Sequence, residues 1–216
     1  MKLLLLGATG LVGSGTLRLA LSNGAFSDVI APTRRPLAPR DRLVNPVGPR
    51  LEELVPLLMS YKPDAVICAL GTTQAKAGSK EAFRYVDYAL PIALGKAAHL
   101  AGVETYAIVT AMGASPGSMS FYYRTKGEVE RDIQEIGFRS LAICRPSLIG
   151  GERNEARAAE GAALTLLRFL APVLPKKFHV NQADVIAATL LDAVIVAKTG
   201  CRWINSQEMI QSQRRA

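Results

Sequence analysis

Short apolar runs alternate along this chain with longer stretches of helical periodicity, and this alternation constrains the fold more than any other feature. Several of the short runs are continuously apolar, which is typical of strands that are covered on both faces. The pattern predicts strands at Lys2–Leu6, Val29–Pro32, Arg42–Pro46, Ala65–Leu70, Thr105–Thr110, Leu141–Arg145 and Cys201–Ile204, and helices at Leu11–Ser22, Leu51–Ser60, Ser79–Ala101, Ser120–Ile136, Glu160–Leu170 and Gln182–Ala197. Alternating strands and helices predict a doubly wound parallel sheet in a three-layer α/β/α fold.

The 216 residues contain no linker rich in Pro, Gly or Ser, so we expect one domain over residues 1–216. Residues 150–180 are expected to form a small substrate-side insert, because the stretch Glu160–Leu174 is apolar with few charges. A dimer face and a contact with lipid are the alternatives for this stretch. The predicted helix Ser79–Ala101 contains Pro91, which should kink or interrupt it. Small and apolar residues recur in this helix at spacings of three and four, which predicts a buried face made of Ala82, Val86, Ala89, Ala93, Ala97 and Leu100.

Composition excludes several classes of protein. The formal net charge of +8 comes from basic residues that are spread along the chain, so we expect no dedicated nucleic-acid surface. No apolar stretch is long enough to span a membrane. The three cysteines, Cys68, Cys144 and Cys201, form no metal-binding spacing, and we expect no metal site. They are predicted to be buried, reduced thiols of a cytoplasmic protein.

A glycine-rich loop, Gly7-Ala8-Thr9-Gly10-Leu11-Val12-Gly13, follows the first predicted strand and opens the first predicted helix. In this context such a loop is typical of dinucleotide binding. Gly7 permits the tight turn, Gly10 lets the backbone approach a pyrophosphate, and Gly13 lets the helix pack closely on the strand. The N–H groups at the helix N-terminus favour a phosphate. The other interpretation is a turn that needs glycine for its conformation only.

The residues after the second predicted strand select between the two nicotinamide dinucleotides. An acid at this point would bind the ribose 2′-hydroxyl of NAD, but the chain has Thr33-Arg34-Arg35. Two guanidinium groups match a 2′-phosphate in charge and in bidentate geometry. The sequence therefore predicts NADP(H) as the cofactor in preference to NAD(H). Two exposed surface arginines are the alternative.

Tyr122 and Lys126 stand four residues apart at the start of the predicted helix Ser120–Ile136, which places them on one helical face. An ammonium group near a phenol stabilises the tyrosinate, so we expect Lys126 to lower the pKa of Tyr122 toward neutral pH. The pair comes after the glycine loop, one strand–helix unit after the predicted strand Thr105–Thr110, and this position favours a catalytic use. Ordinary packing of a Tyr beside a Lys stem is the alternative.

Taken together, these motifs make the chain resemble an atypical short-chain dehydrogenase/reductase with a Rossmann fold, and more closely the Tat-interacting oxidoreductase family. The resemblance runs through nearly the whole chain. The residues that carry it are Gly7–Gly13, Thr33–Arg35, Cys68–Thr73, Lys76–Gly78, Val86-Asp87, Tyr122–Glu130 and Arg145-Pro146. The strings Leu70–Thr73 and Lys126–Glu130 are the most specific to that family.

The resemblance implies a role for each matching residue. The adenosine phosphates of NADPH would be bound by Thr9, Gly10, Leu11, Val12, Arg34 and Arg35, and the fourth strand would contact the cofactor through Leu70, Gly71 and Thr72. Tyr122 would be the proton donor or acceptor, and Lys126 would bind the nicotinamide ribose. Ile149 falls where such folds border the nicotinamide.

One position departs from the superfamily pattern, which has a serine after the fifth strand to bind the substrate oxygen. The chain has Thr110, Ala111 and Met112 there, and Thr110 carries the only hydroxyl of the three. The predicted function is a NADP(H)-dependent oxidoreductase acting on a small carbonyl or alcohol substrate. The alternative is a non-catalytic NADP(H) sensor that acts through protein partners. Whether the chain binds a protein partner or a second copy of itself stays open.

Overall fold

The computed structural model describes residues 1–150 and 180–213 of the chain. Seven parallel strands form its main sheet in the order β3-β2-β1-β4-β5-β6-β9. The strands are β1 (Lys2–Leu6), β2 (Asp28–Ile30), β3 (Leu43–Val44), β4 (Ala65–Cys68), β5 (Thr105–Val109), β6 (Ser140–Arg145) and β9 (Gly200–Asn205). The chain moves outward from β1 in one direction through β2 and β3, and in the other through β4 to β9. The doubly wound parallel sheet is therefore confirmed, and its switch point lies between β1 and β4.

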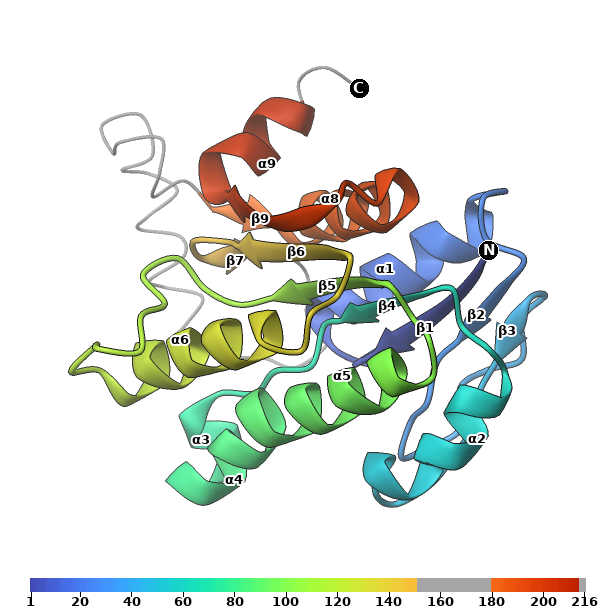
Figure 1. Cartoon of the computed structure of the whole chain (residues 1–216), viewed down its shortest axis with the longest axis horizontal. Coiled ribbons are helices and arrows are strands. Elements are labelled where there is room, and N and C mark those ends of the chain that lie inside the picture. The colour runs from blue at the N-terminus through green and yellow to red at the C-terminus, as the bar shows by residue number, and fades with distance from the viewer. Residues whose placement is uncertain (151–179, 214–216) are drawn as a thin grey trace.

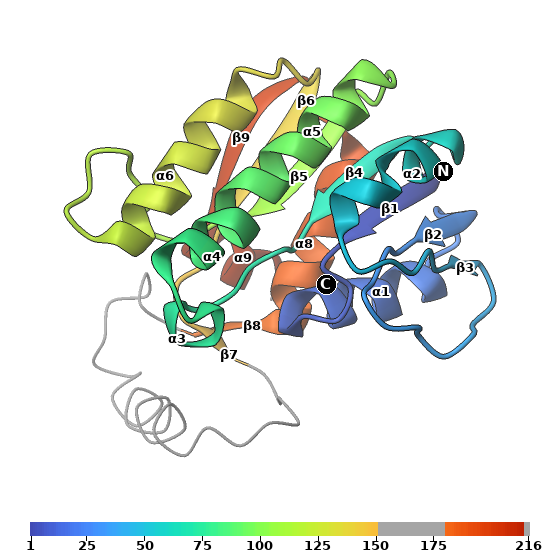
Figure 2. The same ribbon diagram turned by 90° about the horizontal axis from the view of Figure 1, so that it is seen from below.

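Helices cover both faces of this sheet (Figure 1). On one face lie α1 (Leu11–Ser22) and α8 (Ala183–Val196), which pack against each other. On the other face α2 (Val55–Ser60), α5 (Leu90–Leu100) and α6 (Phe121–Gln134) lie side by side (Figure 2). The sheet separates two apolar cores, because alternate strand residues point to opposite faces. Leu3 and Leu5 of β1 belong to the core under α1 and α8, whereas Leu4 and Leu6 belong to the other.

The predicted helix Ser79–Ala101 is divided into three segments: α4 (Lys80–Arg84), the π-helical η2 (Tyr85–Ala89) and α5. Pro91 explains the interruption, since it has no N–H to donate to the carbonyl of Asp87 four residues earlier. The Leu90 N–H instead reaches back five residues to the Tyr85 carbonyl, which is π-helical spacing.

The predicted buried face of this helix is wrong. Ala89 and Ala93 are exposed, and Leu100 is 87% exposed. The buried stripe lies one residue further along the chain and consists of Phe83, Asp87, Leu90, Leu94 and Ala98. The sheet selects this stripe because it carries the bulkier side chains, which fill more of the space over β4 and β5 than alanines do. One of its members is an acid.

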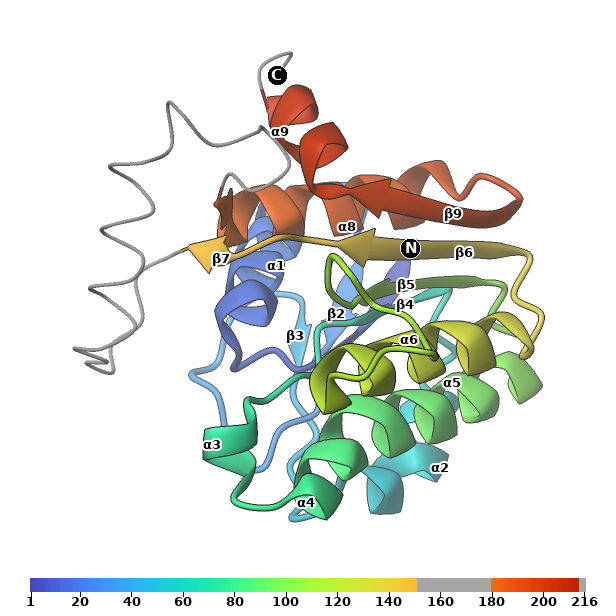
Figure 3. The ribbon, with the colours of Figure 1, turned by 90° about the vertical axis from the view of Figure 1, so that its left-hand side faces the viewer.

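Four short elements were not predicted: α3 (Gln74–Ala77), β7 (Ile149–Gly150), β8 (Asn181–Gln182) and α9 (Ser206–Gln213). Both α3 and β7 lie at the end of the sheet where its strands terminate (Figure 3). The predicted helix Glu160–Leu170 and most of the predicted insert 150–180 lie outside the described residues. Cys68 and Cys144 are buried as predicted, but Cys201 is exposed, because β9 forms an edge of the sheet.

Candidate active site

Two glycines determine the shape of the loop between β1 and α1. Gly7 has a φ of +88°, and a Cβ atom on it would lie 2.6 Å from the carbonyl oxygen of Ala69. A Cβ atom on Gly13 would lie 2.0 Å from the carbonyl oxygen of Gly7. Real Cβ atoms do not approach an oxygen so closely, so neither position accepts a side chain. The loop therefore lies tightly between β1, α1 and the end of β4.

The N-terminus of α1 is arranged to accept an anion. Gly10 is the N-cap residue and makes no side-chain capping bond, and the first turn of the helix contains no acid. Its first N–H groups therefore keep their capacity to donate, and the helix dipole adds a partial positive charge. This is the arrangement that binds phosphate groups in dinucleotide-binding folds.

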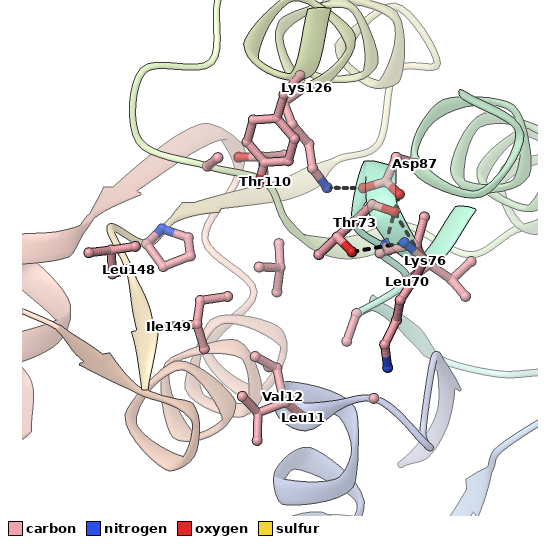
Figure 4. Close-up of a pocket in the computed structure, with 18 of the residues that line it drawn as sticks. Leu11, Val12, Leu70, Thr73, Lys76, Asp87, Thr110, Lys126, Leu148 and Ile149 are labelled. Atoms are coloured by element: carbon pink, nitrogen blue, oxygen red, sulfur yellow. Dashed lines mark hydrogen bonds and ion pairs between the residues drawn. The ribbon is translucent and has the colours of Figure 1, made fainter. Parts of the chain in front are cut away.

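A cavity of about 1290 Å³ lies beyond the carboxyl ends of β1, β4, β5 and β6 (Figure 4). Most of the residues predicted for the site line this one cavity: Thr9, Gly10, Leu11, Val12, Leu70, Gly71, Thr72, Thr110, Tyr122, Lys126 and Ile149. Gly7 and Gly13 lie behind the cavity wall and shape the loop. The topology thus brings residues between Thr9 and Ile149 together at the switch point of the sheet, where ligands of such folds bind.

Tyr122 and Lys126 lie on the first two turns of α6, and both face the cavity. The Tyr122 ring packs against Phe83 with 5.8 Å between ring centroids, and against Tyr123 at 5.2 Å. The Lys126 side chain is almost fully buried, and its Nζ lies 2.7 Å from Oδ1 of Asp87. Figure 4 shows the lysine extended along the wall toward this carboxylate.

The expected effect of Lys126 on Tyr122 is present but is not the dominant one. Burial raises the pKa of Tyr122, Lys126 lowers it, and the negative charge of Asp87 raises it again, so that the net pKa is above its ordinary value. The prediction of a pKa lowered toward neutral pH is therefore wrong for the protein without ligands. The physical reason is first that burial disfavours the charged phenolate, and second that the negative charge of Asp87 opposes the effect of Lys126.

Asp87 carries the family resemblance together with Val86, but it was assigned no role in the predicted site. It lies in η2 and is 2% exposed, and its Oδ2 accepts a hydrogen bond of 2.8 Å from the backbone N–H of Thr72. The spacing of Phe83, Asp87 and Leu90 by four and three residues contained the signal. An acid in a stripe that otherwise buries large apolar side chains needs a buried partner.

Thr110 lines the cavity from the end of β5, but its hydroxyl is directed to a carboxylate. Its Oγ1 donates to Oε1 of Glu130 at 2.6 Å. Glu130, on α6, is buried and also accepts hydrogen bonds from the Arg145 guanidinium at the end of β6. A hydroxyl has one proton, so Thr110 in this arrangement has none for a substrate oxygen. The geometry gives Thr110 a structural bond between β5 and α6.

Arg34 and Arg35 lie outside the cavity lining, on the segment that follows β2. Both side chains are exposed. The bend that presents them is held by Thr33, whose hydroxyl donates to the Arg35 carbonyl at 2.6 Å and accepts a hydrogen bond from Asn45 at 2.9 Å. The two guanidinium groups are therefore exposed side chains of the segment after β2 and are not part of the cavity lining.

Ile149 reaches the cavity because the segment after β6 is tied to the C-terminal part of the chain. Oδ1 of the buried Asn181 accepts hydrogen bonds from the backbone N–H of Ser147 at 2.9 Å and from its hydroxyl at 3.0 Å. Nδ2 of Asn181 donates to the Ser206 carbonyl at 3.2 Å. These bonds fix the start of the segment that carries Leu148 and Ile149, and Figure 4 shows Ile149 near Val12 of α1.

The strand order and the glycine loop define the Rossmann-like α/β class of folds, and solved structures share this fold. UDP-glucose 4-epimerase of Thermotoga maritima, solved with UDP-glucose, superposes with a TM-score of 0.70 at 16% sequence identity, covering 95% of this chain and 77% of the epimerase. The Bordetella bronchiseptica enzyme WbmH, solved with NAD+, gives a TM-score of 0.73 at 17% identity, covering 94% and 75% of the two chains. Similarity at this level of identity shows the fold alone.

Within this class the chain belongs to the HIM1 family, whose pattern matches residues 49–172. It is 36% identical over 209 residues to Protein fmp52, mitochondrial, of Aspergillus fumigatus, with 91% of this chain and 88% of the relative covered. The protein of the same name from Emericella nidulans is 34% identical over the same shares of the two chains. The resemblance to the Tat-interacting oxidoreductases stays a prediction.

The predicted cytoplasmic location conflicts with these relatives, because their names describe them as mitochondrial. We withdraw that prediction. It depended on cysteine chemistry, and reduced thiols are compatible with more than one compartment. Among residues 1–150 and 180–213, no helix is both long enough and apolar enough to cross a membrane.

Proposed function

We propose that this protein binds a nicotinamide dinucleotide, NADP(H) in preference to NAD(H), and reduces a carbonyl compound to an alcohol. The observation that carries the proposal is that one cavity unites the glycine loop with Tyr122 and Lys126. The first can hold a pyrophosphate, and the second pair can move a proton. When bound, the cofactor supplies the hydride for the reaction.

The residues around the cavity fit such a cofactor. Gly7 and Gly13 have no room for a side chain, which keeps the loop close to the end of β4. The N-terminus of α1 offers N–H donors to a phosphate. The cavity exceeds the range of about 300–1,000 Å³ that is usual for small-molecule sites, which suits a dinucleotide together with a substrate. Arg34 and Arg35 stand at the β2 end, where a 2′-phosphate would project.

Tyr122 is the proposed acid. Its raised pKa keeps the phenol protonated at neutral pH, so it can give a proton to the oxygen of a carbonyl as the carbon receives hydride. The products of this step are an alcohol and a tyrosinate, whose negative charge is stabilised by the Lys126 ammonium. A phenol that holds its proton favours the reductive direction over alcohol oxidation, which would need the tyrosinate first.

This function is tested by measuring hydride transfer from NADPH to a panel of aldehydes and ketones. The loss of NADPH absorbance reports the rate. We expect Tyr122→Phe to abolish turnover while the NADPH dissociation constant, measured by fluorescence, changes by less than about threefold. Tyr123→Phe is the matched control, because Tyr123 lies next in sequence, lines the same cavity and should be dispensable. Full activity of Tyr122→Phe, or loss of activity in Tyr123→Phe alone, contradicts the proposed mechanism.

One observation favours a second function, a non-catalytic dinucleotide sensor. The only hydroxyl at the position of the expected substrate-binding serine, that of Thr110, is donated to Glu130. A sensor would bind NADPH through the same loop but reduce no carbonyl compound. Tight NADPH binding by a wild-type protein that turns over no substrate in the panel, with identical melting curves for wild type and Tyr122→Phe, favours this alternative.

A further inference from the structure

Asp87 and Lys126 form a buried ion pair between two elements that are far apart in the sequence. Their charged atoms lie 2.7 Å apart, with 7% of the lysine side chain exposed and none of the aspartate side chain. Removing two charges from water is costly, so such a pair persists only where each group compensates the other. Its position in the cavity wall separates it from the other ion pairs of the described residues.

The backbone around Asp87 explains why its side chain is held there. Asp87 is the third residue of the π-helical segment η2, which ends directly before Leu90 and Pro91. Single π-helical turns are rare in proteins as a whole, and those that occur are frequently found at functional sites. The wider turn lets the Asp87 side chain point into the cavity wall, while Phe83 and Leu90 on the same stripe stay in the apolar core.

The second carboxylate oxygen connects the pair to the loop after β4. Oδ2 accepts the Thr72 N–H at 2.8 Å. A Cβ atom on Gly71, the preceding residue, would lie 3.6 Å from Oδ1 of Asp87 and 3.9 Å from Nζ of Lys126. The pair therefore lies directly beneath the backbone of this loop, and three elements of the cavity wall meet at one carboxylate.

We infer that Asp87 is a positioning residue of the site: it is the counter-ion that holds the Lys126 ammonium at the cavity wall and joins it to the backbone of the β4–α3 loop. The inference rests on the proposed function in one respect, which is that Lys126 and this loop serve a bound dinucleotide. In that case a single buried carboxylate sets the position of α6, which carries Tyr122, relative to the β4–α3 loop.

The electrostatics of the wall give this role a measurable consequence. Burial lowers the pKa of Lys126, but Asp87 and, to a lesser extent, Tyr122 and Cys68 raise it, and the net pKa is above the ordinary value. The pKa of Tyr122 and the pKa of Cys68 are both raised, chiefly by burial, so both groups are neutral at neutral pH. Of the groups that act on the pKa of Lys126, Asp87 is therefore the one that is charged at neutral pH. The Lys76 side chain is a further cation that lines the same cavity.

The test compares two single variants with opposite expected pH dependence. Asp87→Asn keeps an acceptor for the Thr72 N–H but leaves Lys126 without a counter-ion, so its folded-state pKa should fall below its unfolded value. Lys126→Met leaves Asp87 buried without a counter-ion, so its folded-state pKa should rise above its unfolded value. Urea unfolding midpoints of both variants and of wild type are measured from pH 5 to pH 9.

The sign of each effect follows from proton linkage. In Asp87→Asn the unfolded chain binds more protons than the folded chain, so the stability of this variant increases with pH. The difference between its urea unfolding midpoint and that of wild type should therefore narrow by roughly half or more toward pH 9. In Lys126→Met the folded chain binds the extra proton, so the gap to wild type widens from pH 5 to pH 7. The double variant should show a gap that does not change with pH, because neither charge remains.

The inference is overturned if the difference in unfolding midpoint from wild type is constant with pH in both single variants. A lost hydrogen bond or lost packing would give such a constant difference. Glu104→Gln is the matched control, because Glu104 pairs with Arg139 on the surface. If Asp87→Asn is unfolded at every pH, Lys126→Met decides. If both are unfolded, a folded double variant supports the pair and an unfolded one overturns it.

NADPH titration of the same proteins distinguishes this inference from the proposed function. We expect constant NADPH affinity for wild type from pH 6 to pH 9, and for Asp87→Asn a loss of about tenfold over that range as Lys126 releases its proton. If the NADPH affinity of Asp87→Asn has the same pH dependence as that of wild type, the link between the ion pair and the cofactor is overturned. A wild-type protein that binds no NADPH contradicts the proposed function and leaves the unfolding result to decide on Asp87.

Discussion

The two walls of the cavity differ in how their residues come together. On the glycine-loop wall, Gly7 to Gly13 are consecutive residues, and their geometry follows from one strand, one turn and one helix. On the opposite wall, Asp87, Thr110 and Lys126 come from η2, β5 and α6, and each is held by a partner at least 15 residues away. A sequence motif predicts a wall made of consecutive residues. A wall made of long-range pairs depends instead on which partner each polar group contacts in the folded chain.

The largest effect is expected from a side chain in the glycine-loop wall. Gly13→Ala places a Cβ atom 2.0 Å from the Gly7 carbonyl oxygen, so the loop and α1 must separate. We expect the free energy of unfolding to fall by about 3 kcal/mol and NADPH binding to be lost. Gly24→Ala, where nothing lies within 4 Å, is the control and should stay within about 0.5 kcal/mol of wild type. Equal urea midpoints for the two variants would show that the local wall is not rigid.

The next effect concerns the edge of the same wall. Replacing Arg34 and Arg35 by Asp should weaken NADPH binding about tenfold to hundredfold, because two charges that attract a 2′-phosphate become charges that repel it. NADH lacks that phosphate, so its affinity should change little. Calorimetric titration with both cofactors measures the difference, with the exposed Arg40→Asp as the control. Equal losses for NADPH and NADH would remove the argument for NADP(H) preference.

A smaller effect is expected from Thr110 on the opposite wall. Thr110→Val leaves the buried Glu130 without one donor, which should lower the free energy of unfolding by about 1–2 kcal/mol. Turnover should fall by less than about tenfold, since the hydroxyl serves the fold. Thr110→Ser keeps the donor and should resemble wild type in both measurements. Unchanged stability with a much larger loss of turnover would return Thr110 to the substrate-orienting role.

The smallest effect concerns the cysteines, far from both walls. An exposed Cys201 should react at once with a thiol reagent in the native protein, whereas Cys68 and Cys144 should react only after unfolding. Burial raises the pKa of Cys144 to about 12, so the stability that its neutral form contributes is lost as pH rises from about 9 toward 12. Cys201→Ser should remove the fast-reacting thiol without changing stability. Rapid labelling of more than one cysteine would contradict the buried position of the other two.

Periodicity predicted the sheet well because each strand is a local run of apolar residues. All seven predicted strands occur, and β1 and α1 have the predicted bounds. Periodicity failed in the helix over residues 79–101, because counting alanines favoured a face that the sheet does not cover. The face that it does cover includes Asp87, and a residue that is charged is normally read as surface.

The sequence by itself determined the alternation of strands and helices, the glycine loop and the alignment of Tyr122 with Lys126, because each depends on residues that are near one another in the chain. Only the tertiary structure decided that Lys126 pairs with Asp87 and that Thr110 donates to Glu130. The physical reason is that a buried charge or hydroxyl must find a partner wherever the fold brings one within hydrogen-bond distance. That distance is set by the packing of α6 and η2 against the sheet, and no spacing along the chain encodes it.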